Sequence, residues 1–322
     1  TCTFTIYGGK SMSKRPFIID CDTGTDDAIA ILAAYGCPDM DILAITSVNG
    51  NVAEKYTSAN NLNLVEYLGK ETKVARGAAL PLYTRGDYYS DTHGSTGLGN
   101  CELPTAVKSS FIPETAPELI YKLACEHGKI ELLVTGPMTN IAIALSLHPD
   151  LKEHISYIWF MGGAAVGGNV STTAEFNIWV DPYAAKIVIG SGIPMTMVGL
   201  DVTEKAIMLP EDEKELRGFG TKAGTFAADL LQFMFDRCAK GGEDAMMHDS
   251  LALAAAFAPE CLKCTKYFVD VECVGEYTAG HTMVEMKSRK NKDHIPNVEV
   301  ALEIDVPAFR KWLVKSIGNC RG

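Results

Sequence analysis

Four aspartates crowd around a short turn near the start of the chain. Asp20, Asp22, Asp26 and Asp27 lie in the segment 17–32, FIIDCDTGTDDAIAIL, on either side of a Thr-Gly-Thr sequence. Carboxylates this close repel one another, and a hard cation such as calcium or magnesium, which takes oxygen ligands, removes the conflict. The competing interpretation is a helix N-cap with surplus surface acids. The spacing therefore predicts a metal site directly after a first strand.

A second candidate is the pair His248-Asp249, which precedes the apolar segment 251–257. Histidine, with an unperturbed pKa near ~6.5, is suited to donate a proton to a leaving group. Asp249, at the start of the following helix, could cap it. His248 could be an ordinary surface histidine, so both interpretations stay open at this point.

The elements that must position these residues alternate between apolar strands and helical segments. Such alternation predicts an α/β fold, with an open, mostly parallel, Rossmann-like sheet and helices on both faces. Strands are expected at residues 17–19, 42–48, 73–75, 130–134, 155–161 and 195–198. The segments 267–274, 282–287 and 297–304 predict a small antiparallel addition near the C-terminus, followed by a helix at 306–317.

In parallel sheets, ligands bind outside the carboxyl ends of the strands. Polar or flexible residues follow several predicted strands at that edge. The long loop 83–101, which contains His93, has the glycine and tyrosine content of a lid. The residues expected to meet at this edge are Asp22, Asp27, Asn51, Thr135, Met161 and Asp201.

Composition limits the partners. The net charge of −11 argues against nucleic-acid polymers and anionic membranes, and no apolar run approaches the roughly 20 residues that span a bilayer. We therefore expect a soluble, cytoplasmic protein. Ten scattered cysteines suit free thiols in a reducing compartment, and the CxxC at Cys261 and Cys264 suits packing better than metal. Residues 1–15 are predicted to be a tail, and 16–322 a single domain.

Six motifs in order resemble the nucleoside hydrolase family, specifically its inosine–uridine-preferring branch. They are DCDTGTDDA, ITSVNGN, TGPMTNIA, MGG followed by GN and AEFN, VGLDVT and HDSLA. The resemblance implies an open α/β domain around a tightly bound calcium ion. It also implies a small-molecule nucleoside as substrate, cleavage of its N-glycosidic bond to free base and ribose, and a homodimer or homotetramer.

The resemblance also assigns roles to individual residues. It implies hydrolysis by a water at the calcium ion, with Asp22 as the general base and His248 as the acid for the departing base. Calcium ligands would be Asp22, Asp27, the Thr135 carbonyl and Asp249. The substrate would be bound by Asp26, Asn51, Met161, Asn169, Glu175, Asn177 and His93.

The chain departs from the family pattern at three places. Ser95 stands where an acid is expected after His-Gly in the lid, and Thr23 stands where proline is common. Segment 226–247, where the family places base-facing residues, has no match, so the preferred base stays open. Two alternatives also remain: a haloacid dehalogenase-type phosphatase, which has paired aspartates after its first strand, and a non-catalytic, calcium-dependent ribose binder.

Overall fold

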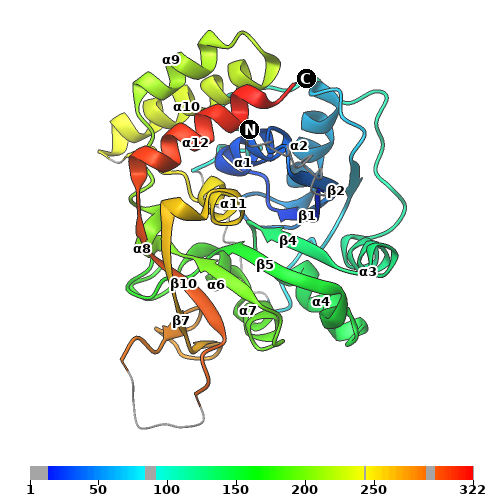
Figure 1. Ribbon diagram of the computed structural model, residues 1–322, viewed down its shortest axis with the longest axis vertical. Coiled ribbons are helices and arrows are strands. Elements are labelled where there is room, and N and C mark those ends of the chain that lie inside the picture. The colour runs from blue at the N-terminus through cyan, green and yellow to red at the C-terminus, as the bar shows by residue number, and fades with distance from the viewer. Residues whose placement is uncertain (1–13, 84–91, 243, 288–293, 322) are drawn as a thin grey trace, which may run out of the picture.

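The computed structural model describes residues 14–83, 92–242, 244–287 and 294–321. Its main sheet has eight strands in the order β3-β2-β1-β4-β5-β6-β10-β7 (Figure 1). All neighbouring strands pair in parallel except β7, which runs antiparallel to β10. The predicted α/β class is therefore confirmed. The strands are β1 (Arg15–Cys21), β2 (Met40–Ser47), β3 (Lys73–Ala75), β4 (Ile130–Val134), β5 (Ile155–Met161), β6 (Met195–Val198), β7 (Leu262–Tyr267) and β10 (Val298–Ile304).

Side chains of the central strands are buried on both faces of the sheet. Along β1, Phe17 and Ile19 belong to one apolar cluster and Ile18 belongs to the other. Alternate side chains of a strand point to opposite faces, so a continuous apolar run is what a strand covered on both sides requires. This explains the apolar run at residues 17–19 of β1, directly before its aspartate.

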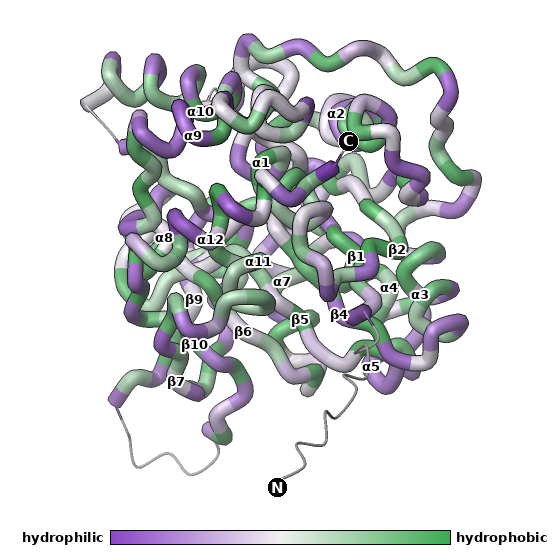
Figure 2. The backbone as a smooth tube through the Cα atoms, turned by 45° about the horizontal axis from the view of Figure 1, so that its top comes forward, coloured by the Kyte–Doolittle hydropathy of each residue, from purple (hydrophilic) through white to green (hydrophobic). Residues whose placement is uncertain are grey.

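Helices form a layer on each face of the sheet (Figure 1). One face is covered by α1 (Thr25–Tyr35), α2 (Glu54–Tyr67), α10 (Lys222–Gly241), α11 (Asp249–Phe257) and α12 (Val306–Asn319). The other is covered by α3 (Ala116–His127), α4 (Thr139–Leu147) and α7 (Pro182–Ile189). Figure 2 shows green and purple turns alternating along α9 (Pro210–Gly218) and α10, as expected of helices with one face toward the core. Short helices complete the chain: α5 (Leu151–His154), α6 (Phe176–Val180), α8 (Leu200–Thr203) and the 3₁₀ turn Pro259–Cys261.

The strand order reverses at β1. From β1 the chain proceeds outward through β2 and β3 on one side, and through β4, β5 and β6 on the other. Such a switch point leaves a crevice outside the carboxyl ends of the two central strands, where ligands bind. The segments that follow β1 and β4 begin at Asp22 and Thr135, so the predicted metal ligands flank this crevice.

The C-terminal region differs from the prediction in two ways. Strand β10 is not part of a separate antiparallel addition, because it pairs in parallel with β6 inside the main sheet. Strand β7, which the sequence analysis did not predict as a strand, forms the edge of that sheet. The small antiparallel unit that does exist consists of β8 (Val269–Val271) and β9 (Thr282–Val284).

The predicted tail extends one residue too far. Arg15 is the first residue of β1, and its guanidinium donates to both carboxylate oxygens of Glu131 and to the carbonyl of Ala256. Residues 1–13 lie outside the described part of the chain. No helix within the described residues is long and apolar enough to cross a membrane.

No described cysteine is joined by a disulfide to another described residue. Cys261 is buried and Cys264 is exposed on β7, and neither belongs to a group of described side chains arranged to hold a metal. Cys125, near the end of α3, is exposed.

Candidate active site

The turn after β1 is folded around the side chain of Asp27. Its Oδ2 accepts hydrogen bonds from the Gly24 backbone at 2.8 Å and from Asn51 Nδ2 at 3.1 Å. Its Oδ1 accepts from the Thr135 hydroxyl at 2.7 Å. Because Asp27 stands in the first turn of α1, the helix dipole also favours its negative charge. One side chain therefore joins the ends of β1 and β4 with the loop after β2.

Asp22 is fixed beside it by the loop that follows β2. The Asn51 backbone donates to Asp22 Oδ2 at 2.7 Å, whereas Oδ1 of the same carboxylate has no hydrogen-bond partner within the described part of the chain. A Cβ placed on Gly50 would lie 2.0 Å from Asp22 Oδ2, so only glycine leaves room for the carboxylate there. Asp22 is 1% exposed, and a buried carboxylate oxygen of this kind suits coordination of a cation.

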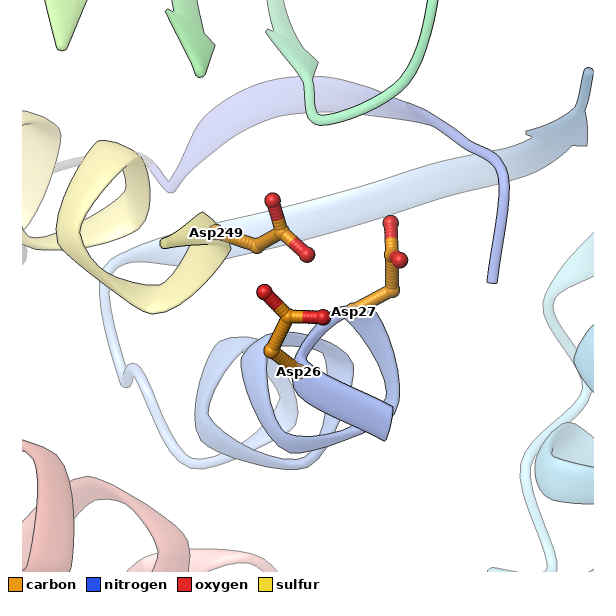
Figure 3. A group of neighbouring side chains, drawn as sticks. All are labelled: Asp26, Asp27 and Asp249. Atoms are coloured by element: carbon orange, nitrogen blue, oxygen red, sulfur yellow. The ribbon is translucent and has the colours of Figure 1, made fainter. Parts of the chain in front are cut away.

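Asp249, at the start of α11, lies far from these residues in the sequence. Figure 3 shows its carboxylate turned toward those of Asp26 and Asp27, which project from the first turn of α1. One oxygen from each of the three lies within 4.8 Å of the others, and Asp26 Oδ1 has no hydrogen-bond partner. The structure thus brings together acids that the sequence separates widely.

The electrostatics of this cluster favour a bound cation. Burial raises the pKa of Asp22, Asp27 and Asp249, and neighbouring carboxylates raise each of these pKa values further. Groups in this condition cannot all ionise near neutral pH unless positive charge compensates them. The donor set consists of oxygens alone, which suits a hard divalent ion such as calcium. The residues present therefore fit such an ion.

Asp20 has a supporting position. It is fully buried, and its Oδ1 accepts from the Thr46 hydroxyl at 2.6 Å and from Asn140 Nδ2 at 2.8 Å. Burial raises its pKa to about 7. Its backbone carbonyl accepts from the Thr135 amide at 2.9 Å, so the Asp20 segment orients the start of the loop that carries Thr135.

A cavity of about 420 Å³ opens above the acids. Ten of the twelve residues predicted for the site line it, and Asp22 and Asp27 lie behind its wall. The ten lining residues are Asp26, Asn51, His93, Thr135, Met161, Asn169, Glu175, Asn177, His248 and Asp249.

One wall of the cavity is held rigidly around Glu175, the N-cap of α6. Its carboxylate accepts from the Gly163 and Asn177 backbones at 2.9 Å, and burial raises its pKa. Asn177 Nδ2 in turn donates to the Thr135 carbonyl at 2.8 Å. Asn169 is anchored through Oδ1, which accepts from the Phe176 backbone at 2.9 Å. These bonds set the amide and carboxylate groups before any ligand binds.

Two histidines also line the cavity. His93 Nδ1 lies 3.0 Å from the Thr25 hydroxyl and 3.8 Å from Asp26 Oδ1. His248 Nδ1 lies 2.9 Å from the Thr203 hydroxyl, which leaves Nε2 as its other ring nitrogen. Burial lowers the pKa of both rings, and the negative charge of Asp26 partly opposes that effect.

Sequence reasoning missed the outer end of the cavity. Most of this end lies along the C-terminal half of α10 and the segment that links it to α11, and Glu204, at the end of α8, completes it. These side chains combine acids, thioethers and a guanidinium. The sequence analysis indicated only that the family places base-facing residues in segment 226–247, because the approach of individual side chains depends on how the buried face of α10 packs. They are Glu204, Met234, Arg237, Asp244 and Met246.

Comparisons with known proteins identify the family of the chain. Residues 17–311 match the family model described as inosine-uridine preferring nucleoside hydrolase. The chain is 39% identical over 301 residues to the pyrimidine-specific ribonucleoside hydrolase RihA of Escherichia coli O81 (strain ED1a), covering 91% of this chain and 95% of that one. It is 40% identical over 309 residues to the RihA of Citrobacter koseri, covering 94% and 97%.

A solved structure shows the same architecture. The purine-preferring ribonucleoside hydrolase from Gardnerella vaginalis superposes with a TM-score of 0.87 at 33% identity, covering 95% of this chain and 99% of that one. Both the family model and these relatives span nearly the whole chain. The chain therefore belongs to the inosine-uridine preferring nucleoside hydrolase family, and it is an enzyme that hydrolyses the N-glycosidic bond of ribonucleosides.

Proposed function

We propose that this enzyme holds one calcium ion through Asp22, Asp27, Asp249 and the Thr135 carbonyl, and binds the ribose of its substrate directly above. The observation that carries the proposal is a group of buried carboxylates at the switch point of the sheet. Oxygens of Asp26, Asp27 and Asp249 lie within 4.8 Å of one another, and one oxygen of the nearby Asp22 has no hydrogen-bond partner among the described residues. A bound calcium ion would supply positive charge that polarises hydroxyl groups and lowers the pKa of a water molecule.

The ribose subsite is assigned to the side chains fixed along the cavity wall. Asp26 and Asn51 lie on the cluster side and can pair with ribose hydroxyls, while Asn169, Glu175 and Asn177 line the other wall. Met161, 3% exposed, provides an apolar surface for the sugar. The carbon–nitrogen bond breaks through an oxocarbenium-like sugar, so carboxylates around the ring stabilise the positive charge that develops.

Asp22 is the proposed general base. Its Oδ2 is occupied by the Asn51 backbone, whereas Oδ1 is unpaired and can accept a proton from the attacking water.

His248 is the proposed acid for the departing base. With Nδ1 at the Thr203 hydroxyl, Nε2 is the ring nitrogen that can hold the proton to be transferred. His93 is assigned to the substrate because it lines the cavity beside Asp26. The cytoplasmic location stays a prediction from composition. The homodimeric or homotetrameric state stays a prediction from the family resemblance.

The charge of the cavity separates nucleosides from phosphorylated compounds. Its described lining includes five carboxylates, on Asp26, Glu175, Glu204, Asp244 and Asp249, and one guanidinium, on Arg237. Placing a phosphate dianion among these acids costs several kcal/mol, because like charges repel. The haloacid dehalogenase-type alternative, which requires a phosphate ester as substrate, has no support in this arrangement.

We therefore expect ribose release from purine or pyrimidine ribonucleosides, with kcat/KM for inosine at least ~100-fold above that for inosine 5′-monophosphate. The measurement is a reducing-sugar assay on inosine, guanosine, uridine and cytidine, together with a phosphate assay on the nucleotide. Both pyrimidines and purines are included because the similar proteins differ in base preference. Phosphate release without ribose release would favour the phosphatase, and binding without turnover would favour the ribose binder.

A further inference from the structure

His93 reaches the cavity from a compact turn at residues 92–99. Its ring nitrogen Nδ1 lies 3.2 Å from the Thr25 backbone nitrogen, over the first turn of α1. The turn closes on itself where the Gly99 amide donates to the His93 carbonyl at 2.8 Å. The depth of the His93 ring in the cavity therefore depends on the contacts that hold this turn against the β1–α1 segment.

Asn60 of α2 provides that connection. Its side-chain amide donates to the Thr96 carbonyl at 2.7 Å and to the Thr23 carbonyl at 3.2 Å. The residue is 7% exposed, and the two acceptors belong to different segments: the turn that carries His93 and the turn that carries the clustered aspartates. One amide group thus joins both halves of the site.

The His93 turn packs closely against Asn60 and the aspartate-bearing turn. Gly97, with φ of +96°, approaches so nearly that a Cβ on it would lie 2.7 Å from the Thr23 carbonyl and 2.8 Å from Asn60 Nδ2. The neighbouring Asn61 faces inward instead, where it bonds to Thr23 Oγ1, Cys21 and Ser47. Of these two asparagines, Asn60 is the one that bonds to the His93 turn.

We propose that Asn60 is a positioning residue, which fixes the His93 turn to the aspartate-bearing turn and thereby sets the place of His93 in the substrate cavity. Asn60 does not line that cavity. The inference rests on the proposed function in one respect, the assignment of His93 to the nucleoside. It predicts an effect that passes through His93 rather than through the stability of α2.

The test compares Asn60→Ala with the wild-type enzyme on one ribonucleoside. We expect KM to rise about tenfold, with kcat within about threefold, because loss of a hydrogen bond that positions a ground-state contact weakens binding. Asn63→Ala is the matched control. Asn63 lies on the same helix and accepts from the Ala106 amide at 2.9 Å, away from the His93 turn. Its kinetic constants should stay at wild-type values.

A double-mutant cycle with His93→Ala separates positioning from a general structural role. If Asn60 acts through His93, the KM of the double variant should lie within about twofold of that of His93→Ala alone. A KM that rises by the product of the two single effects would overturn the proposal. So would an Asn60→Ala enzyme with wild-type KM.

Gly97→Ala keeps the test decisive if Asn60→Ala fails to fold. It leaves Asn60 in place but pushes the turn away from it, and it should reproduce the selective rise in KM. Circular dichroism and thermal unfolding identify the variants that remain folded. If the wild-type enzyme releases ribose and Gly97→Ala has the same KM, only this inference is contradicted. If the wild-type enzyme releases no ribose, the proposed function itself is contradicted.

Discussion

A nucleoside that lacks the 2′-hydroxyl should be cleaved up to ~10⁴-fold less efficiently than its ribonucleoside parent. The expected cause is the set of buried polar groups assigned to the ribose, above all Asp26 and Asn51, which are 5% and 9% exposed. Without the hydroxyl, at least one of them stays desolvated and unpaired, and a site built to hydrogen-bond a hydroxyl rejects such an analogue strongly.

The measurement is kcat/KM for inosine and 2′-deoxyinosine, and for uridine and 2′-deoxyuridine. The intrinsic chemistry works in the opposite direction, because a 2′-hydroxyl withdraws electrons from the developing oxocarbenium ion and slows its formation. A large preference for the ribonucleoside must therefore come from the enzyme. Similar efficiencies for the two members of each pair would contradict the assignment of this wall to the ribose hydroxyls.

Replacement of His248 by alanine should lower kcat for inosine by about 10²–10⁴-fold, the usual range for a single general acid. The reason is its place at the cavity, where Nδ1 is engaged by Thr203 and Nε2 is the other ring nitrogen. KM should change little, because the residues assigned to the ribose lie elsewhere.

The control for this prediction is a second substrate rather than a second variant. The p-nitrophenolate of p-nitrophenyl riboside leaves without protonation, so His248→Ala should slow its release far less than it slows inosine cleavage. An equal loss of kcat on both substrates would show that His248 supports the structure or acts on the sugar. The proton donor would then have to be another group.

The inner half of the site could be predicted from the sequence because its residues are fixed by local rules. Asp22 and Thr135 directly follow buried strands, and Asp26 and Asp27 begin a helix, so their meeting at one edge of a parallel sheet follows from topology. Asp249 is different: no local pattern relates it to Asp27, and its place followed from the family resemblance alone.

The outer half could not be predicted because its geometry depends on tertiary packing. Met234 and Arg237 line the cavity only because the buried face of α10, with Phe226, Leu230 and Leu231, packs into the core at a particular depth. Nothing in the spacing of these residues fixes that depth.

The same reason explains the error at the edge of the sheet. Four consecutive residues of β7, from 263 to 266, are exposed, so its sequence lacks the alternation that identifies a half-buried strand. Its position is set instead by pairing with β10.

Calcium binding to the metal-stripped enzyme tests the central claim most directly. Isothermal titration calorimetry should show one ion per chain for the wild-type protein. In Asp249→Asn the calcium affinity should fall at least ~100-fold. Loss of a residue that only orients a metal ligand already lowers metal affinity by up to ~100-fold, and loss of a ligand should lower it at least as much. Asp201→Asn is the matched control. Within the described residues, the Asp201 carboxylate accepts hydrogen bonds from the Ala165 and Val166 amides. Wild-type affinity in Asp201→Asn with a large loss in Asp249→Asn is the predicted result. No calcium binding by the wild-type protein, or equal affinity in Asp249→Asn, would contradict the account.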